Sequence, residues 1–200
     1  MSAGPVPKRV RKDPDARRAE ILTMARQVFA ASSYNDVGIA AVASAAQVSK
    51  GLVYRYFPDG RPELIVGVMT DLVAEFSQRL RQAANAPFSS QTRMEHLLGA
   101  LFAFFAENPA AYRLLFRDPW MAREPAVEAA AIAVRVQLSA EIAGVMAGSG
   151  LPANDLMAAS AGILGFALAN VELCETEQID PETAWRVSCR YATAFDGTAS

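Results

Sequence analysis

Residues 42–57 read VASAAQVSKGLVYRYF, and this stretch decides how the N-terminal part of the chain folds. Ile39, Val42 and Ala43 form an apolar stripe on a short helix that ends near residue 45, and Gln47 lies in the following turn. Ser49 is a good N-cap for a second short helix, and Val53 and Phe57 share its inner face at i, i+4 spacing. The pattern therefore predicts two short helices that flank a tight turn.

The outward face of the second short helix has the chemistry of a DNA reader. Lys50, Tyr54 and Arg55 are left facing away from the apolar positions. A helix fits the major groove, where lysine or arginine donates to guanine edges, while hydroxyl groups and helix N-termini bind phosphates. This is the composition that a recognition helix requires.

Helical patterns continue on both sides of this unit. Asp13 and Pro14 can start a first helix that ends near residue 32, and Pro58-Asp59-Gly60 ends the recognition unit. Further helices are predicted at about 62–84, 91–107, 110–116, 124–147, 154–174 and 181–195, with a break at Asp118-Pro119 and no convincing strand. The sequence thus predicts an all-α fold of about nine helices.

The predicted organisation is a small domain followed by a larger one. We expect a disordered basic tail at 1–13 and a three-helix domain with the helix-turn-helix at 14–60. A larger helical domain for ligand binding and dimerisation is expected at 61–200. The tail residues Lys8, Arg9, Arg11 and Lys12 could enter a minor groove or simply be disordered, and this alternative stays open.

Composition indicates a cytoplasmic globular protein without metal or cofactor. Hydrophobic residues make up 52% of the chain, enough for a substantial core, and the run from Leu156 to Val171 is too interrupted for a membrane span. No apolar stretch follows the basic N-terminus, so a secretory signal is not expected. Two cysteines and the single His96 leave no disulfide framework and few zinc geometries.

Charge is distributed unevenly along the chain. Residues 1–60 hold nine Lys and Arg against five Asp and Glu, whereas residues 61–200 hold ten against sixteen. A basic segment on an acidic body suits a protein that faces phosphates with one end only, because electrostatics dominates nucleic-acid affinity.

The region from about 17 to 64 resembles the TetR family of repressors. The matching residues are Tyr34, Val42-Ala43, Ala46, Val48-Ser49-Lys50-Gly51, Tyr54 and Phe57. The chain departs from the family pattern at Ser33, Val37-Gly38, Gln47, Leu52 and Tyr56, several of which normally help to hold phosphate. Beyond this region only the length and the helical layout resemble the family.

The resemblance implies roles for individual residues in binding a near-palindromic double-stranded operator. Lys50 is expected to read a base edge, with Gln47 and Leu52 as secondary readers. Ser49, Tyr54, Tyr56 and Arg61 are expected to position phosphates, Arg61 because it lies near the N-terminus of the fourth helix.

The resemblance also implies a small apolar or amphipathic effector in the larger domain, where bulky apolar residues concentrate. The alternative is plain core packing, since aromatic residues at helical spacing are more often core than ligand site. The candidate ligand-binding residues are Leu98, Leu101, Phe102, Phe105, Tyr112, Phe116, Trp120, Met121 and Phe166.

Two C-terminal helices are expected to pair across a two-fold axis, as in the family, which gives a homodimer. Small residues on one helix let a partner helix approach closely; the alternative is that both helices pack only on their own subunit. The candidate interface residues are Ala158, Gly162, Gly165, Ala169, Trp185, Cys189 and Ala192.

Two other function classes compete with a repressor released by its effector. An enzyme is disfavoured because the central segment shows no nucleophile paired with a base, no carboxylate dyad and no metal set. The more serious alternative is a helical ligand-binding protein whose DNA binding is weakened or lost, because several phosphate-contact positions are replaced.

Overall fold

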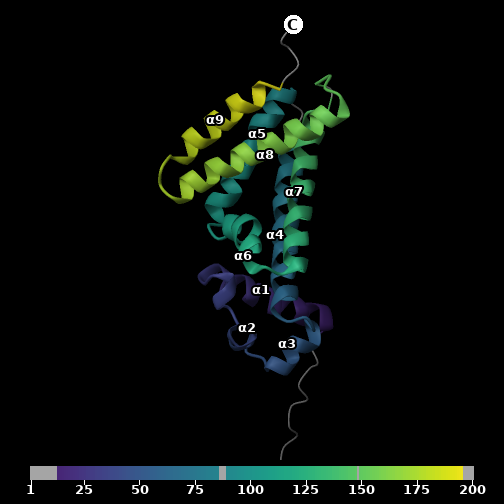
Figure 1. Cartoon of the computed structure of the whole chain (residues 1–200), viewed down its shortest axis with the longest axis vertical. Helices are drawn as coiled ribbons and strands as arrows, with labels where there is room; N and C mark the ends of the chain where they lie inside the picture. Colours follow the sequence, from purple (N-terminus) through teal and green to yellow (C-terminus); the bar gives the residue numbers. More distant parts are fainter. Residues whose placement is uncertain (1–12, 86–88, 148, 196–200) are drawn as a thin grey trace, which may run out of the picture.

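The computed structural model describes residues 13–85, 89–147 and 149–195, and within these ranges every regular element is helical (Figure 1). The predicted all-α fold is therefore confirmed. The elements are α1 (Pro14–Ala31), η1 (Tyr34–Asp36), α2 (Ile39–Ala45), α3 (Lys50–Tyr56), α4 (Arg61–Ala84), α5 (Ser90–Glu107), η2 (Arg113–Arg117), α6 (Asp118–Ala122), α7 (Pro125–Val145), α8 (Ala153–Glu175) and α9 (Pro181–Thr193).

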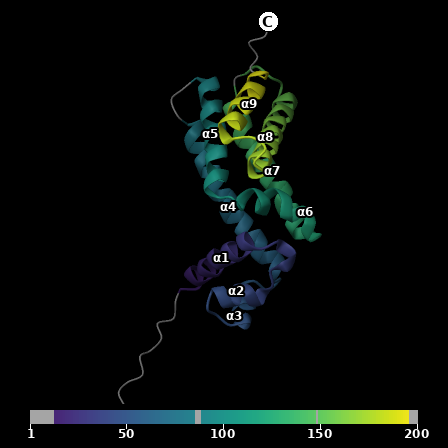
Figure 2. The same ribbon diagram turned by 90° about the vertical axis from the view of Figure 1, so that its left-hand side faces the viewer.

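Helices α1, α2 and α3 form a small domain at one end of the molecule, set apart from the larger domain in both views (Figures 1 and 2). Phe29, Val53 and Phe57 are fully buried in it, and the ring of Tyr34 stacks on Phe29 with centroids 6.0 Å apart. Full burial of each such side chain contributes roughly 1.5–3 kcal/mol. These few residues therefore hold the domain together.

The turn between α2 and α3 fixes how the two helices are set against each other. Gln47 adopts φ 53°, the left-handed conformation that commonly ends a helix. The Val48 N–H donates to the Ala43 carbonyl at 2.9 Å, and the Leu52 N–H donates to the Ser49 side chain at 3.2 Å. A left-handed non-glycine residue costs roughly 1–2 kcal/mol, which the capping bonds and the packing of both helices offset.

Helix α4 belongs to both domains (Figure 1). Near its start, the position of a Cβ on Gly67 would lie 2.7 Å from Cδ2 of Leu22, so α4 touches α1 where only glycine leaves room. Near its end, the Phe76 ring stacks on Phe104 of α5 with centroids 4.4 Å apart. One continuous helix thus joins the small domain to the core of the larger one.

Helix α8 packs between α7 and α9 in the larger domain. Among the described helices it alone is long and apolar enough to cross a membrane, and 44% of its most apolar window is buried in the structure. Ile163, Leu164, Ala167 and Leu168 lie in the core. Its apolar composition is therefore that of a core helix.

Two local expectations need correction or addition. A helix was predicted at 110–116 with a break at Asp118-Pro119, but a π-helical turn, η2, leads directly into α6, which begins at Asp118. Proline is tolerated there because an N–H in the first turn has no helical partner to lose. Asp13 precedes α1 as expected, yet its side chain makes no capping hydrogen bond. The rest of the predicted tail lies outside the described residues.

Arg113 of η2 joins the larger domain to the C-terminus of α1. Its guanidinium group donates to the carbonyl of Phe29 at 2.6 Å and to those of Ala30 and Ser32 at 3.1 Å, and it pairs with Asp118. The last carbonyls of a helix lack helical partners, and the last turn of α1 itself carries no basic side chain. A residue more than eighty positions away therefore caps this helix.

We expect Arg113→Met to lower the free energy of unfolding by about 3 kcal/mol, because the almost fully buried Asp118 would lose its charged partner. The measurement is urea denaturation at pH 7. Burial already raises the pKa of Asp118 against the effect of Arg113, and losing Arg113 raises it further. The deficit should therefore shrink as the pH falls through that raised pKa and the carboxyl takes up a proton.

Arg190→Met is the control, because the Arg190 side chain is exposed on α9, far from Asp118 along the chain. Its effect should stay within about 0.5 kcal/mol. Equal losses in the two variants would show that the cap on α1 does not stabilise the fold.

Candidate nucleic-acid interface and ligand cleft

Helix α3 turns its polar side chains to solvent and its apolar ones to the core. Lys50 and Arg55 are exposed and Tyr54 is 49% exposed, whereas Val53 and Phe57 are completely buried. The buried pair fixes the rotation of the helix about its own axis. The arrangement thus presents a cation and a phenol on one rigid surface.

The remaining predicted DNA-contact residues of this region lie in the turn before α3 and along α3. Gln47 and Ser49 are exposed, and Leu52 and Tyr56 are partly exposed. Because the Ser49 hydroxyl accepts from the Leu52 N–H, it also holds the first turn of α3 in place. The predicted set from 47 to 56 is thus brought together by the turn and one short helix.

The Arg61 side chain contacts residues of the small domain. Its guanidinium group donates to the carbonyl of Asn35 at 3.2 Å and lies over the Tyr34 ring, 4.4 Å from the centroid. These contacts arise because the start of α4 lies beside η1. The predicted phosphate contact of Arg61 stays a prediction, and the structure gives the side chain an intramolecular role that its sequence position did not reveal.

Two arginines of α1, which the sequence could not distinguish, differ in the structure. Arg17 pairs with Glu20 at 2.7 Å. Arg18 is exposed, with its guanidinium group 4.9 Å from the centroid of the Phe57 ring at the end of α3. Arg18 is therefore an additional cation close to the recognition helix.

Most of the predicted ligand-binding residues form the core of the larger domain. Leu98, Leu101, Phe102, Phe105, Tyr112 and Phe116 are all at most 8% exposed. Rings of Phe76, Phe104, Phe105, Tyr112 and Phe116 contact one another with centroids 4.4 to 6.2 Å apart. Most of these residues therefore pack in the core, as the alternative interpretation of the sequence expected.

A cleft of about 200 Å³ opens at the edge of this aromatic cluster, between the ends of α5 and α8 and the start of α9. Its lining consists of Phe102, Phe105, Ala106, Pro109, Val171, Cys174, Glu175 and Pro181. Two of the predicted residues thus lie on its wall. The other lining residues come from segments whose proximity to Phe102 and Phe105 was not predicted from the sequence.

Three predicted ligand residues lie elsewhere or cannot be placed. Trp120 is 46% exposed on α6 and lines a surface hollow with Asn35 and Arg123 instead of the cleft. Phe166 stacks on Tyr191 of α9 with centroids 4.4 Å apart. The side chain of Met121 lies outside the described residues.

Burial raises the pKa of two polar groups beside the cleft. The Tyr112 hydroxyl donates to Glu172 of α8 at 3.0 Å, and burial together with this carboxylate raises the pKa of Tyr112 to about 12. Burial, with a smaller effect of Asp180, raises the pKa of the Cys174 thiol. Within the described residues, no three His, Cys, Asp or Glu side chains are grouped to hold a metal ion.

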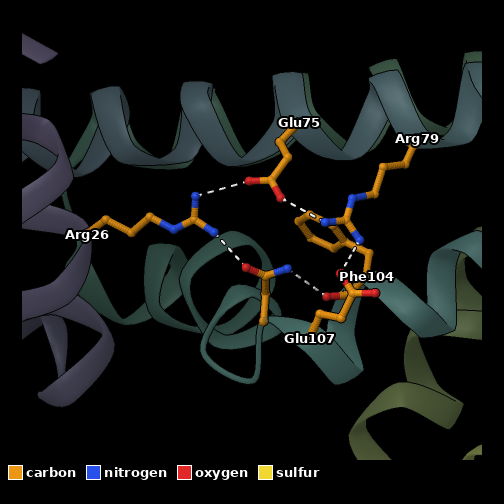
Figure 3. A network of polar contacts seen from close by, with 6 residues as sticks. Arg26, Glu75, Arg79, Phe104 and Glu107 are labelled. Atoms are coloured by element: carbon orange, nitrogen blue, oxygen red, sulfur yellow. Dashed lines mark hydrogen bonds and ion pairs between the residues drawn. The ribbon is translucent and has the colours of Figure 1, made fainter.

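A polar network ties α1 to the larger domain beside the aromatic cluster (Figure 3). Arg26 of α1 donates to Glu75 of α4 at 3.1 Å and to Asn108 at 2.6 Å. Arg79 connects Glu75, at 3.2 Å, to Glu107 at the end of α5, at 2.5 Å. The small domain is therefore fastened to α4 and α5 as well as to η2.

Helix α8 exposes part of the predicted dimer surface. Ala158, Gly165 and Ala169 are exposed, and a Cβ on Gly165 would meet no atom within 4 Å. Gly162 is partly exposed, and its Cβ position lies 3.5 Å from the Tyr191 hydroxyl. Small residues thus leave an open strip along this helix.

The predicted interface residues of α9 are less exposed to solvent than those of α8. Trp185 is 37% exposed and its indole N–H donates to the carbonyl of Glu95 at 3.1 Å, while Cys189 is partly buried. Ala192 is only 4% exposed within its own chain. Ala192 therefore packs in the core of its own chain, and its place in an interface stays a prediction.

Comparison with known proteins agrees with this architecture. The model of the family described as bacterial regulatory proteins, tetR family, matches residues 21–65, which contain the recognition unit and the start of α4. The HTH-type transcriptional activator FasR of Mycolicibacterium smegmatis is 24% identical over 180 residues, covering 89% of this chain and 82% of that protein.

Solved structures share the fold over nearly the whole chain. A TetR-like transcriptional regulator from Rhodococcus sp. has a TM-score of 0.73 at 19% identity, covering 92% of this chain and 97% of that one. The transcriptional regulator FadR from Bacillus subtilis, in complex with stearoyl-CoA, has a TM-score of 0.72 at 13% identity, covering 91% and 99%.

The family match coincides with the helix-turn-helix whose geometry is described above, and the helical domain behind it has the architecture of these regulators. Residues 21–65 therefore belong to the tetR family of bacterial regulatory proteins, and the chain as a whole has the fold of TetR-like transcriptional regulators.

Proposed function

We propose that this chain is a homodimeric repressor that binds a near-palindromic DNA operator and is released by a small apolar or amphipathic effector. The exposed face of α3, with Lys50 and Tyr54 held outward by two fully buried residues, is the observation that carries the proposal. A two-fold dimer would present two such helices to half-sites about one helical turn, roughly 34–36 Å, apart. We also propose a cytoplasmic location, where the operator is accessible.

Within this proposal Lys50 reads a base edge in the major groove, and the hydroxyl groups of Ser49, Tyr54 and Tyr56 position phosphates. Gln47 and Leu52 are secondary readers. Arg18 adds a cation that the family comparison did not bring forward, since it lies over Phe57 at the end of α3. Arg61 would have to leave its contact with Asn35 to reach a phosphate.

An effector can act only through a difference in its affinity for two arrangements of the DNA-binding domains. The short η2 segment supports such a connection, because Phe116 on it belongs to the aromatic cluster while Arg113 caps α1. Tyr112, which directly precedes η2, contacts both Phe105 and Glu172. We propose that a ligand in the adjacent cleft shifts η2 and thereby α1.

The named relatives bear on the class of effector and on the direction of regulation. FasR is named an activator, and the solved FadR structure contains stearoyl-CoA. We carry over only that a small molecule with an apolar part is the effector. A reporter gene behind the selected operator, with and without this chain, tests repression directly, and increased expression would contradict it.

The competing function, a ligand-binding protein with weakened DNA binding, is favoured by Gln47 in a left-handed turn and by the engaged Arg61. Selection of bound sequences from a random DNA library separates the two. Enrichment of a palindrome supports the regulator, and no enrichment at low salt supports the alternative.

Lys50→Ala should weaken binding to the selected operator by about tenfold to a hundredfold, as expected for a lost contact to a base edge. Fluorescence anisotropy at fixed salt concentration measures the dissociation constant. The control is Arg186→Ala, an exposed cation on α9 far from the recognition unit along the chain, which should change affinity less than about twofold. Unchanged affinity in Lys50→Ala would remove this residue from the interface.

Gly165→Glu should convert the dimer to a monomer, because it places a carboxylate on the exposed strip of α8 where no charge could be buried in an interface. The single chain should still fold, since a Cβ at this position meets nothing within 4 Å. Sedimentation velocity measures the mass in solution.

Gly144→Glu on α7 is the matched control, because its Cβ would also meet nothing within 4 Å. It should remain dimeric. Dissociation by Gly144→Glu but not by Gly165→Glu would move the interface from α8 to α7.

A further inference from the structure

Gly60 lies between the end of the recognition unit and α4, in a backbone conformation that favours glycine. It is buried, with φ 71° and ψ −127°. Glycine adopts positive φ about as readily as negative φ, whereas a residue with a Cβ atom is strained there. The Gly60 N–H donates to the Phe57 carbonyl at 3.0 Å, and the Gly60 carbonyl accepts from the Leu64 N–H at 3.1 Å. These bonds fix Gly60 relative to the end of α3 and the start of α4.

The ring of Tyr54 lies in the space beside Gly60 that a side chain would otherwise need. A Cβ on Gly60 would lie 3.3 Å from Cε1 of Tyr54, closer than the optimal separation of two carbon atoms. It would also lie 3.9 Å from Cδ1 of Ile39, the first residue of α2. The Tyr54 ring and the Ile39 side chain therefore flank one gap, which exists because residue 60 is glycine.

This requirement distinguishes Gly60 from the other two glycines of the recognition unit. A Cβ on Gly38 would meet no atom within 4 Å, and a Cβ on Gly51 would meet only Oγ of Ser49, at 4.0 Å. Neither of them has a positive φ, whereas Gly60 does. Of the three, only Gly60 combines a positive φ with a closely packed side chain.

The contact involves the outer end of the Tyr54 ring. Cε1 is bonded to the ring carbon that carries the hydroxyl group, so whatever displaces Cε1 also displaces the hydroxyl. Tyr54 is 49% exposed, and its neighbour Val53 is completely buried. The buried neighbour fixes where the Tyr54 side chain begins. Because a tyrosine side chain has only two χ angles, a contact at its outer end then limits where the hydroxyl group can lie.

We propose that Gly60 is a positioning residue for DNA binding: it sets the place of the Tyr54 hydroxyl group, which binds a phosphate. This inference rests on the proposed function in taking Tyr54 as a phosphate contact. It goes beyond that function by making a buried glycine of the turn into α4 a determinant of operator affinity. A hydrogen bond from a hydroxyl group to an anionic oxygen is short, about 2.5–2.7 Å, so a small displacement of the ring weakens it.

The test is a double-mutant cycle of Gly60→Ala and Tyr54→Phe in the full chain. Fluorescence anisotropy measures the dissociation constant of the selected operator. Tyr54→Phe keeps the ring and removes only the hydroxyl group. In the chain with Tyr54, Gly60→Ala should weaken operator binding by about fivefold or more, because the added methyl group displaces the ring. In the Tyr54→Phe chain it should weaken binding by less than about twofold, because the hydroxyl contact is already absent.

Equal factors in the two backgrounds would overturn the inference. They would show that Gly60 shapes only the start of α4 and does not act through the Tyr54 hydroxyl group. This readout separates positioning from a general structural effect, since a displaced α4 would weaken binding whether or not the hydroxyl is present.

Gly150→Ala is the matched control. Gly150 also has a positive φ, 83°, but its Cβ would meet nothing within 4 Å, and it lies between α7 and α8. The variant therefore introduces backbone strain without displacing a side chain, and it should change operator affinity by less than about twofold. All dissociation constants are measured at a temperature at which circular dichroism shows every variant to be fully folded.

A second measurement needs no substitution at position 60. In the wild-type chain, nuclear magnetic resonance should show a nuclear Overhauser effect between Hα of Gly60 and Hε of Tyr54, with the Tyr54 signal assigned by its loss in Tyr54→Phe. Absence of this effect would overturn the inference even if Gly60→Ala failed to fold.

Operator binding by the wild-type chain separates this inference from the proposed function. If the wild-type chain enriches no operator, the DNA-binding function itself is rejected. If the wild-type chain binds and Tyr54→Phe binds equally well, Tyr54 makes no phosphate contact through its hydroxyl group. The role of Gly60 is then rejected, and the DNA-binding function still stands.

Discussion

Helix α4 is the constraint on which the rest of the structure depends. Its 24 residues form one helix that packs against α1 of the small domain and against α5 and α7 of the larger one. Gly67 of α4 lies close against the Leu22 side chain of α1. Farther along α4, the Phe76 ring stacks on the Phe104 ring of α5. Under the proposed mechanism, a shift of the aromatic cluster would be transmitted to the small domain, because packed interiors transmit strain.

Two arginine side chains fasten α1 to the larger domain. Arg113 holds the last carbonyls of α1 from η2, and Arg26 holds α1 to Glu75 and Asn108 (Figure 3). A π-helical turn such as η2 is rare and frequently marks a functional position. Here it lies between the aromatic cluster and α1. The small domain is thus fixed to both α4 and η2, so a change in their relative position would reorient the recognition helix.

Aromatic side chains of the larger domain contact one another in its interior, and the cleft proposed for a ligand lies at the edge, where α5 and α8 end. Helix α8 serves three surfaces: it packs on α7 and α9, lines the cleft with Val171 and Glu175, and leaves small residues such as Gly165 exposed. Its largely apolar composition is consistent with these three surfaces.

The sequence by itself determined the helix-turn-helix, because its signals are local: the Ser49 cap, the i, i+4 pair Val53 and Phe57, and the turn at Gln47 act within a few residues of one another. It also located most of the helices and, through the family resemblance, the surface that we propose faces DNA. Only the tertiary structure decided which residues meet across long sequence distances. Arg61 lies on Tyr34, Arg113 caps α1, Ala192 is enclosed in its own chain, and Phe102 lines a cleft with Glu175 while Trp120 does not. Helical periodicity says which face of a helix is apolar, but it does not say which neighbour covers that face, and this is settled only by how the helices pack.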